Sequence, residues 1–146
     1  MNGSATQRLS DFTMRKIEHI GIAVKDLEVS NLLFEKLFGA PSYKQEEVAS
    51  EGVKTSFFMN GPNKIELLEA TNPESPIAKF LEKKGEGIHH IAFDVDDIIS
   101  EIARLKKEGF IILNEIPKKG ADNKLVAFLH PKTTNGVLIE LCQEIK

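Results

Sequence analysis

The chain contains 146 residues with a formal net charge of −3, and 41% of the residues are hydrophobic. This length suits one domain with its own core, and the charge gives no support for binding nucleic acid, whose domains usually present a basic patch. No segment approaches the ~20 apolar residues of a membrane-spanning helix, and a single cysteine, Cys142, excludes a disulfide within the chain, so we expect a cytoplasmic protein.

The N-terminal stretch MNGSATQRLSDFT is polar, so we expect residues 1–14 to be an extension or a tag and residues 15–146 to form one domain. The first element expected in this domain is a strand at residues 17–24, because its residues are β-branched and alternate in polarity. Asp26 is predicted to cap a helix that ends at Gly39. The apolar face predicted for this helix consists of Val29, Leu33, Phe34 and Leu37. Three further strands are expected at residues 43–48, 53–60 and 64–69.

A linker helix is predicted to begin at Ser75-Pro76 and to end before Gly85, because proline is favoured in the first turn and glycine just after the last. The elements that follow repeat the order of the first half. A strand at residues 88–95 precedes a helix that Asp96 or Asp97 caps. The apolar face of that helix consists of Ile98, Ile102 and Leu105. Three more strands are expected at residues 110–113, 124–130 and 136–142.

The two halves also share sequence. The segment IEHIGIAVKDL at residues 17–27 matches IHHIAFDVDDI at residues 88–98 with an offset of 71, and IELLE at residues 65–69 matches IELCQ at residues 139–143 with an offset of 74. Isoleucine, leucine and glutamate are common, so chance similarity is the alternative. Two blocks that agree in order, each with a polar residue in the same phase, favour a duplication. The sequence therefore predicts two βαβββ modules, at about residues 17–70 and 88–143, joined by the linker helix.

Four polar side chains fall on matching faces of the predicted strands. Because alternate residues of a strand point to opposite sides, His19 lies opposite the bulky residues that pack on the helix, and His90 has the same phase. Glu66 and Glu140 likewise lie opposite their apolar neighbours. If the modules pair about a twofold axis, two imidazoles and two carboxylates meet in one cleft and form a site for a divalent metal. For each residue alone, a structural histidine or a solvated glutamate is the alternative.

The same alternation predicts that the adjacent residues His89 and His90 point to opposite faces of the strand. His90 is expected to face the cleft, whereas His89 is expected to pack behind the strand with the apolar residues of the other face. Glu18 holds the position of His89 in the first module, and its side chain is not expected to bind anything.

Three segments resemble the vicinal oxygen chelate superfamily, which includes glyoxalase I, and most specifically the methylmalonyl-CoA epimerases within it: IEHIGIAV, IELLEATNPESPIAKFLEKKGEGIHHIAFDVDDI and VAFLHPKTTNGVLIELCQ. The resemblance implies an α+β fold of tandem βαβββ modules, with a cleft-bearing curved sheet and helices on its outer face. It implies interconversion of (R)- and (S)-methylmalonyl-CoA by a 1,1-proton transfer through an enolate. It also implies a homodimer and a divalent metal (Co, Mn, Ni or Zn, with cobalt favoured). The ligands would be His19, Glu66, His90 and Glu140, and Glu140 would also be catalytic.

One position departs from the pattern of some bacterial relatives, which have a second glutamate where this chain has Thr55. A threonine has no useful basicity near neutral pH, so the second acid–base group stays open between Glu47, Glu51 and a metal-bound water. Two other functions remain alternatives: a metal-dependent enzyme of the same fold, such as a glyoxalase-type lyase, or a metal-free protein that binds small molecules.

Overall fold

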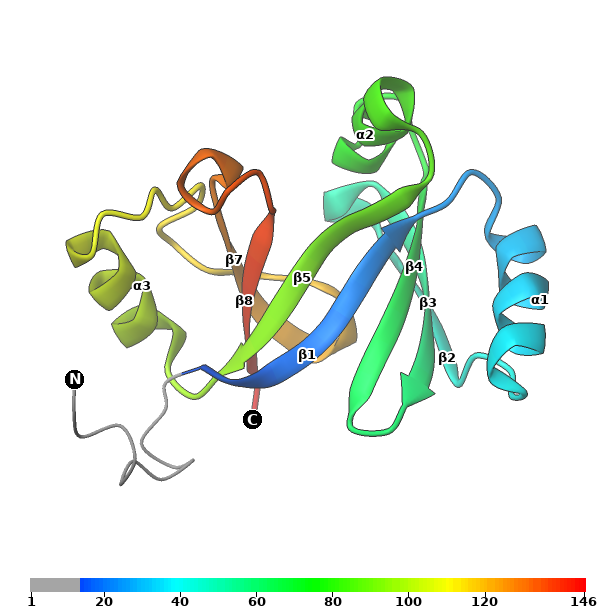
Figure 1. The fold of residues 1–146 in the computed structure, drawn as a ribbon, viewed down its shortest axis with the longest axis horizontal. Helices are drawn as coiled ribbons and strands as arrows, with labels where there is room; N and C mark the ends of the chain where they lie inside the picture. The colour runs from blue at the N-terminus through cyan, green and yellow to red at the C-terminus, as the bar shows by residue number, and fades with distance from the viewer. Residues whose placement is uncertain (1–13) are drawn as a thin grey trace.

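The computed structural model describes residues 14–146, so the expected extension at residues 1–14 lies almost entirely outside the described part of the chain. Figure 1 shows a strongly curved sheet with helices attached to it. The strands are β1 (Met14–Ala23), β2 (Lys44–Val48), β3 (Val53–Asn60), β4 (Asn63–Ala70), β5 (Gly87–Val95), β6 (Lys118–Lys119), β7 (Lys124–Leu129) and β8 (Ile139–Glu144). The helices are α1 (Leu27–Phe38), α2 (Pro76–Lys84) and α3 (Ile98–Lys107), with short 3-10 turns η3 (Ala49–Glu51), η4 (Ala121–Asn123) and η5 (Pro131–Thr133).

All eight strands belong to one sheet, in the order β2-β3-β4-β1-β5-β8-β7-β6. The first four strands in this order come from the first half of the chain and the last four from the second. Within each half the first strand pairs in parallel with the last, β1 with β4 and β5 with β8. The halves join through the antiparallel pair β1–β5 at the centre. The predicted fold class is therefore confirmed: two modules of the same topology form one curved α+β sheet.

Helix α3 packs on the second module as the sequence predicts. Asp97 is the residue that caps it, because the Asp97 side chain accepts a hydrogen bond from the backbone N–H of Ser100. Ile98, Ile102 and Leu105 are buried against Val95, Leu129 and Leu141, which belong to strands β5, β7 and β8. Within residues 14–146, no helix is long and apolar enough to cross a lipid bilayer.

Helix α1 has the predicted ends but packs through a different face. Asp26 accepts from the N–H of Val29, and Gly39 has the left-handed conformation that ends the helix. The side chains that pack on the sheet are those of Leu27, Phe34 and Phe38, which contact Phe58 and Leu67. Three residues of the predicted apolar face are exposed instead: Val29, Leu33 and Leu37. The helix is apolar on two sides, and the side with two phenylalanines is buried because their rings fill the space around Phe58.

Helix α2 lies across one end of the curved sheet, above the place where the two halves meet (Figure 1). Ser75 caps it, and Ile77 packs with Ala23, Val53 and Leu68. The expectation of helices on the outer face therefore holds for α1 and α3, whereas α2 contributes to the wall of the concave side.

The strand predicted at residues 110–113 is wrong. Ile112 forms a single bridge with Leu129, and the strand that follows in the sheet order, β6, is only two residues long. Around this bridge the N–H of Leu113 donates to the carbonyl of Phe128, and the N–H of His130 donates to the carbonyl of Ile111. The pairing goes no further because the side chain of Asn114 then occupies the edge of β7: its amide donates to the carbonyl of Val126 and its oxygen accepts from the N–H of Phe128. A side-chain amide here replaces the backbone of a longer strand.

Candidate metal centre

Four polar side chains meet on the concave side of the sheet, one from each strand of its middle. His19 comes from β1, Glu66 from β4, His90 from β5 and Glu140 from β8. Each is at most 5% exposed. The parallel pairs within each module and the antiparallel pair between modules place these strands in one row, so His19 and His90, 71 positions apart, become neighbours, and each glutamate approaches both imidazoles.

The donor atoms of these side chains face one another. The Nε2 atoms of His19 and His90 are 3.1 Å apart. Glu140 Oε1 lies 3.0 Å from Nε2 of His90 and 3.6 Å from Nε2 of His19. Glu66 Oε1 lies 3.1 Å from Nε2 of His19 and 3.8 Å from that of His90. The donors of His19, His90 and Glu140 all lie within 4.8 Å of one another.

This arrangement fits a divalent metal ion. With metal–ligand bonds of about 2.1 Å, neighbouring ligands of an octahedral shell lie about 3.0 Å apart and those of a tetrahedral shell about 3.4 Å apart. The donor separations of 3.0 to 3.8 Å span this range. Two nitrogen and two oxygen donors are also the kind of set that first-row divalent metals accept.

Two β-bulges, one in each module, orient the histidines. The register of β1 against β5 skips Glu18 between Ile17 and His19, and it skips His89 between Ile88 and His90. A bulge adds a residue to one strand and redirects its side chain, so simple alternation fails at both positions. A doubled polar residue within an apolar strand, repeated at the same place in both modules, is the sequence signal for this irregularity.

Glu18 is part of the centre, contrary to the expectation that it binds nothing. It is buried, and its Oε1 accepts a hydrogen bond of 2.7 Å from Nδ1 of His19. With Nδ1 protonated in this way, Nε2 of His19 is the nitrogen left to bind a metal. Metal-binding histidines commonly donate their second N–H to a carboxylate, which fixes the ring and increases its basicity.

His89 also borders the concave side, contrary to the expectation that it packs behind the strand. Its Nδ1 lies 2.9 Å from Nδ1 of His90, and its ring meets the edge of Phe80 from α2 with centroids 5.0 Å apart. His89 therefore stands behind His90 as Glu18 stands behind His19. Each module therefore has a β-bulge at this position, with a carboxylate in the first module and an imidazole in the second.

Gly21 provides the space that the second histidine needs. A Cβ added at this position would lie 2.2 Å from Cε1 of His90, far inside van der Waals contact. Gly21 pairs with His90 across the β1–β5 interface, so a side chain there would push the imidazole away from the other donors.

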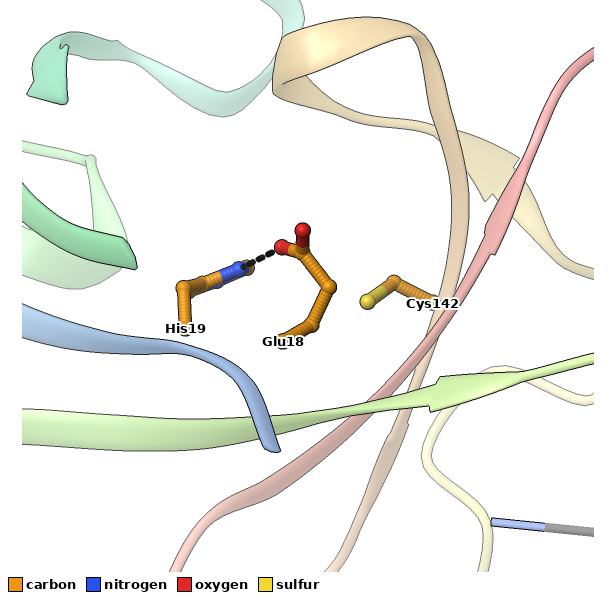
Figure 2. A group of neighbouring side chains, drawn as sticks. All are labelled: Glu18, His19 and Cys142. Carbon is orange, nitrogen blue, oxygen red and sulfur yellow. Dashed lines mark hydrogen bonds and ion pairs between the residues drawn. The ribbon is translucent and has the colours of Figure 1, made fainter. Parts of the chain in front are cut away.

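Figure 2 shows a second group of potential ligands behind His19, formed by Glu18, His19 and Cys142. The ammonium group of Lys64 lies 2.7 Å from the other oxygen of Glu18 and already neutralises that carboxylate. Cys142 is fully buried beside Ala92 and Val126, and burial raises the pKa of its thiol. This group therefore supports His19 from behind and does not form a second metal site.

The side chains of the centre are buried, so they shift one another's pKa values strongly. Burial would lower the pKa of His19, but the carboxylates of Glu66 and Glu140 raise this pKa well above its ordinary value. Burial would raise the pKa of Glu140, but His19 and His90 together lower it. Both carboxylate–imidazole pairs are thus arranged to hold positive charge between them, which is the charge that a divalent cation provides.

A cavity of about 320 Å³ opens beside the centre. Most of its wall is apolar and comes from Val53, Phe57, Leu68, Ile77, Val126, Phe128 and Leu138. Of the two glutamates considered for acid–base chemistry, Glu51 lines this cavity and pairs with Lys118 at 3.0 Å, whereas Glu47 is exposed and does not. Thr55 is fully buried and donates to Oε2 of Glu66 at 2.7 Å, so it holds a candidate ligand in place.

The pKa of His89 predicts how the stability of the metal-free protein depends on pH. Burial, followed by the charge of His90, lowers this pKa to about 4. Between about pH 6.5 and about pH 4 the unfolded chain binds a proton at His89 that the folded chain does not, so the free energy of unfolding decreases as the pH falls through this window.

Urea denaturation in the presence of a chelator, repeated across that range, measures the effect. The His89→Asn variant should lose less stability than the wild-type protein on acidification. If the free energy of unfolding changed with pH in the same way in both proteins, His89 would not be the group responsible.

Comparison with known proteins places the chain in a family. Residues 18–128 match the model of the Glyoxalase/Bleomycin resistance protein/Dioxygenase superfamily. The ethylmalonyl-CoA/methylmalonyl-CoA epimerase of Cereibacter sphaeroides is 44% identical over 88% of this chain and 97% of its own length. The mitochondrial methylmalonyl-CoA epimerase of Homo sapiens is 40% identical over 92% of this chain and 77% of its own.

A solved structure shares the fold as well as the sequence. A variant of the Streptomyces coelicolor methylmalonyl-CoA epimerase in complex with 2-nitronate-propionyl-CoA superimposes with a TM-score of 0.86, at 34% identity over 90% of this chain and 95% of the other. The chain therefore belongs to the Glyoxalase/Bleomycin resistance protein/Dioxygenase superfamily, and its similarity to methylmalonyl-CoA epimerases extends over most of its length.

Proposed function

We propose that the chain is a metal-dependent methylmalonyl-CoA epimerase that interconverts the (R) and (S) forms by moving the proton at C2. The observation that carries this proposal is the buried set of two imidazoles and two carboxylates beside an apolar cavity, in a chain about 40% identical to such epimerases. The cavity is large enough for a small acyl group. Its apolar wall suits the methyl substituent, and the polar centre suits the carboxylate and thioester.

His19, Glu66, His90 and Glu140 would hold the metal. The mixed imidazole and carboxylate set is compatible with Co, Mn, Ni or Zn, and we favour cobalt. When bound, a divalent cation supplies positive charge that stabilises the charge developing on the thioester oxygen as C2 loses its proton. The burial of all four side chains keeps water away from them, which strengthens each of these electrostatic interactions.

Glu140 is the residue that we assign to proton transfer. Its Oε1 faces both imidazoles, so Oε2 of the same carboxylate is the atom that we assign to the substrate proton. Glu66 is assigned no such role, because Thr55 already donates to its Oε2. The two glutamates therefore share a position in the repeat but differ in their surroundings.

We further propose a homodimer formed through the exposed face of α1. Four apolar side chains on this face are more than 60% exposed: Val29, Leu32, Leu33 and Leu37. An exposed apolar patch of this kind, opposite the side of the helix that packs on the sheet, marks an interface. If two copies of α1 cross in antiparallel fashion about a twofold axis, Lys36 near one end approaches Glu28 near the other end of its partner, so the face is complementary to itself. A cytoplasmic location, where the single thiol stays reduced, completes the proposal.

Proton exchange tests the reaction. In deuterated water with cobalt supplied, the protein should exchange the C2 proton of methylmalonyl-CoA, as followed by the loss of its NMR signal. His90→Ala should slow exchange at least ~100-fold, because a lost ligand weakens the metal site. A glyoxalase-type lyase would leave this proton in place, and a binding protein would bind the substrate without exchange, so wild-type protein without exchange would contradict the proposal.

Gly21→Ala tests the space around His90. The added methyl group should displace the imidazole and lower cobalt affinity by about tenfold or more, because supporting groups of a metal site contribute on this scale. The control is Gly61→Ala at the β3–β4 turn, where nothing lies within 4 Å of an added Cβ and φ is 63°, so this substitution strains the backbone without crowding a side chain and should leave cobalt affinity unchanged. Equal cobalt affinity in Gly21→Ala and wild-type protein, measured by competition with a chelator, would show that His90 is not a ligand.

Leu33→Glu tests the proposed dimer. A charge in the centre of the α1 face should convert the dimer to a monomer in sedimentation velocity experiments, because the buried carboxylate would have no partner. Ile116→Glu is the control, since Ile116 is an isolated apolar residue that is 84% exposed. A monomeric wild-type protein, or a dimer that survives the Leu33 substitution, would refute this interface.

A further inference from the structure

A line of alternating charges extends from the back of His19 to the surface. Nδ1 of His19 donates to Glu18 Oε1, and Glu18 Oε2 accepts from the ammonium of Lys64 at 2.7 Å. The same ammonium donates to Oδ2 of Asp122 at 2.8 Å. Lys44 then donates to the other oxygen of Asp122 at 2.9 Å. Glu18, Lys64 and Asp122 are therefore each paired on two sides, and Nζ of the buried Lys124 on β7 lies 3.8 Å from the same oxygen of Glu18 as a second, longer ion pair.

The line connects the two modules at the open side of the curved sheet. His19, Glu18, Lys64 and Lys44 belong to the first module, whereas Asp122 lies in η4 of the second. The backbone N–H of Asp122 also donates to Glu46 Oε1 from β2, at 2.9 Å. Because β2 is one end of the strand order and η4 lies between the strands at the other end, these side-chain contacts bridge the two ends of the sheet, whose edge strands do not pair. Asp122 has a left-handed conformation with φ of 59°, which non-glycine residues rarely adopt without support from their surroundings.

We infer that Lys64 and Asp122 are positioning residues for His19. They hold the Glu18 carboxylate in the one orientation in which it accepts the Nδ1 proton, and Glu18 in turn directs Nε2 of His19 toward the other three donors. The inference rests on the proposed metal-dependent function. The metal affinity of the centre then depends on Asp122, a residue of the second module that is not itself a ligand.

The burial of this line distinguishes it from an ordinary surface ion pair. The side chain of Glu18 is 5% exposed, and those of Lys64 and Asp122 are 17% and 20% exposed. Removing one partner of a buried pair leaves the remaining charge uncompensated, so the neighbouring groups must rearrange or attract water. Lys64 without Asp122 would shift toward bulk water, and the Glu18 carboxylate that it holds would lose its fixed position behind His19.

The second module offers an internal comparison. His89 occupies the position of Glu18 and contacts Nδ1 of His90, but as an imidazole it needs no cation to balance it. Its ring is fixed by Phe80 instead. The supporting line of charges is therefore specific to the His19 half of the centre, where a carboxylate has been buried.

The test compares Asp122→Asn with wild-type protein by two measurements. The first is cobalt affinity, determined by competition with a chelator, which should fall about tenfold, as expected for groups that support a metal ligand. The second does not depend on metal: the Nδ1 proton of His19 should give a protected downfield NMR signal in the metal-free wild type, and this proton should exchange with water much faster in the variant.

Two further variants and a control complete the design. Lys64→Arg keeps the charge and should retain most of the protection of the His19 Nδ1 proton, whereas Lys64→Met should lose this protection. Lys44→Gln removes a partner of Asp122 that is itself more exposed than Lys64, and because partly exposed pairs contribute less than buried ones it should lower cobalt affinity only about two- to threefold. The control is Lys106→Met, which removes an exposed ion pair of similar length with Glu115, remote from the centre, and should change neither measurement.

The outcomes separate this inference from the proposed function. Unchanged cobalt affinity and unchanged Nδ1 protection in folded Asp122→Asn, with folding verified by circular dichroism, would overturn the inference. If Asp122→Asn does not fold, the comparison of Lys44→Gln with Lys106→Met decides in the same way. Wild-type protein that binds no cobalt but shows the Nδ1 signal, lost in Asp122→Asn, would support the positioning role while contradicting the metal-dependent function.

Discussion

The antiparallel pairing of β1 with β5 is the interaction on which the rest of the structure depends. It joins two modules that would otherwise each end in an open strand edge, and it places the two histidines at equivalent positions of the repeat, His19 and His90, with their Nε2 atoms 3.1 Å apart. The parallel neighbours of these strands, β4 and β8, then bring a glutamate to each side. Without this central pair the sequence would contain the donors but no site, since residues of either module alone provide one imidazole and one carboxylate.

Of the three register shifts in this pair, the two bulges at Glu18 and His89 show how duplication and asymmetry coexist. Both modules interrupt the strand at the residue before the histidine of the centre, which forces a polar side chain into the space behind the imidazole. In the first module this side chain is a carboxylate that must be balanced by Lys64, and in the second it is a neutral imidazole against Phe80. The backbone arrangement is thus shared, whereas the charge behind each ligand is not. The centre therefore has a carboxylate behind one imidazole and a neutral ring behind the other, although its four inner side chains are arranged symmetrically.

Burial explains why so many charged groups of this small protein depend on one another. Glu18, His19, Glu66, His90 and Glu140 are all nearly inaccessible to water. A group of this kind is stable only if every charge has a partner, because the cost of desolvation is otherwise large. The hydroxyl of Thr55 on Glu66 and the ammonium of Lys64 on Glu18 satisfy the outer oxygens, which leaves the inner atoms free to face one another. The proposed metal would complete this balance at the centre.

The sequence by itself determined the topology, the repeat and the four donors, because strand periodicity, helix caps and matching offsets are local properties that survive without a structure. It also identified Asp26, Ser75 and Gly39 as the ends of helices for the same reason. Only the tertiary structure decided where Glu18 and His89 point, because a bulge depends on the partner strand and breaks the alternation from which facing is read. It likewise decided which side of α1 is buried, since both sides are apolar and the choice depends on how well the phenylalanines fit around Phe58. The strand predicted at residues 110–113 is reduced to one bridge between Ile112 and Leu129 for a similar reason, because the side chain of Asn114 takes over the contacts with β7 directly after it, and no periodicity predicts that contact.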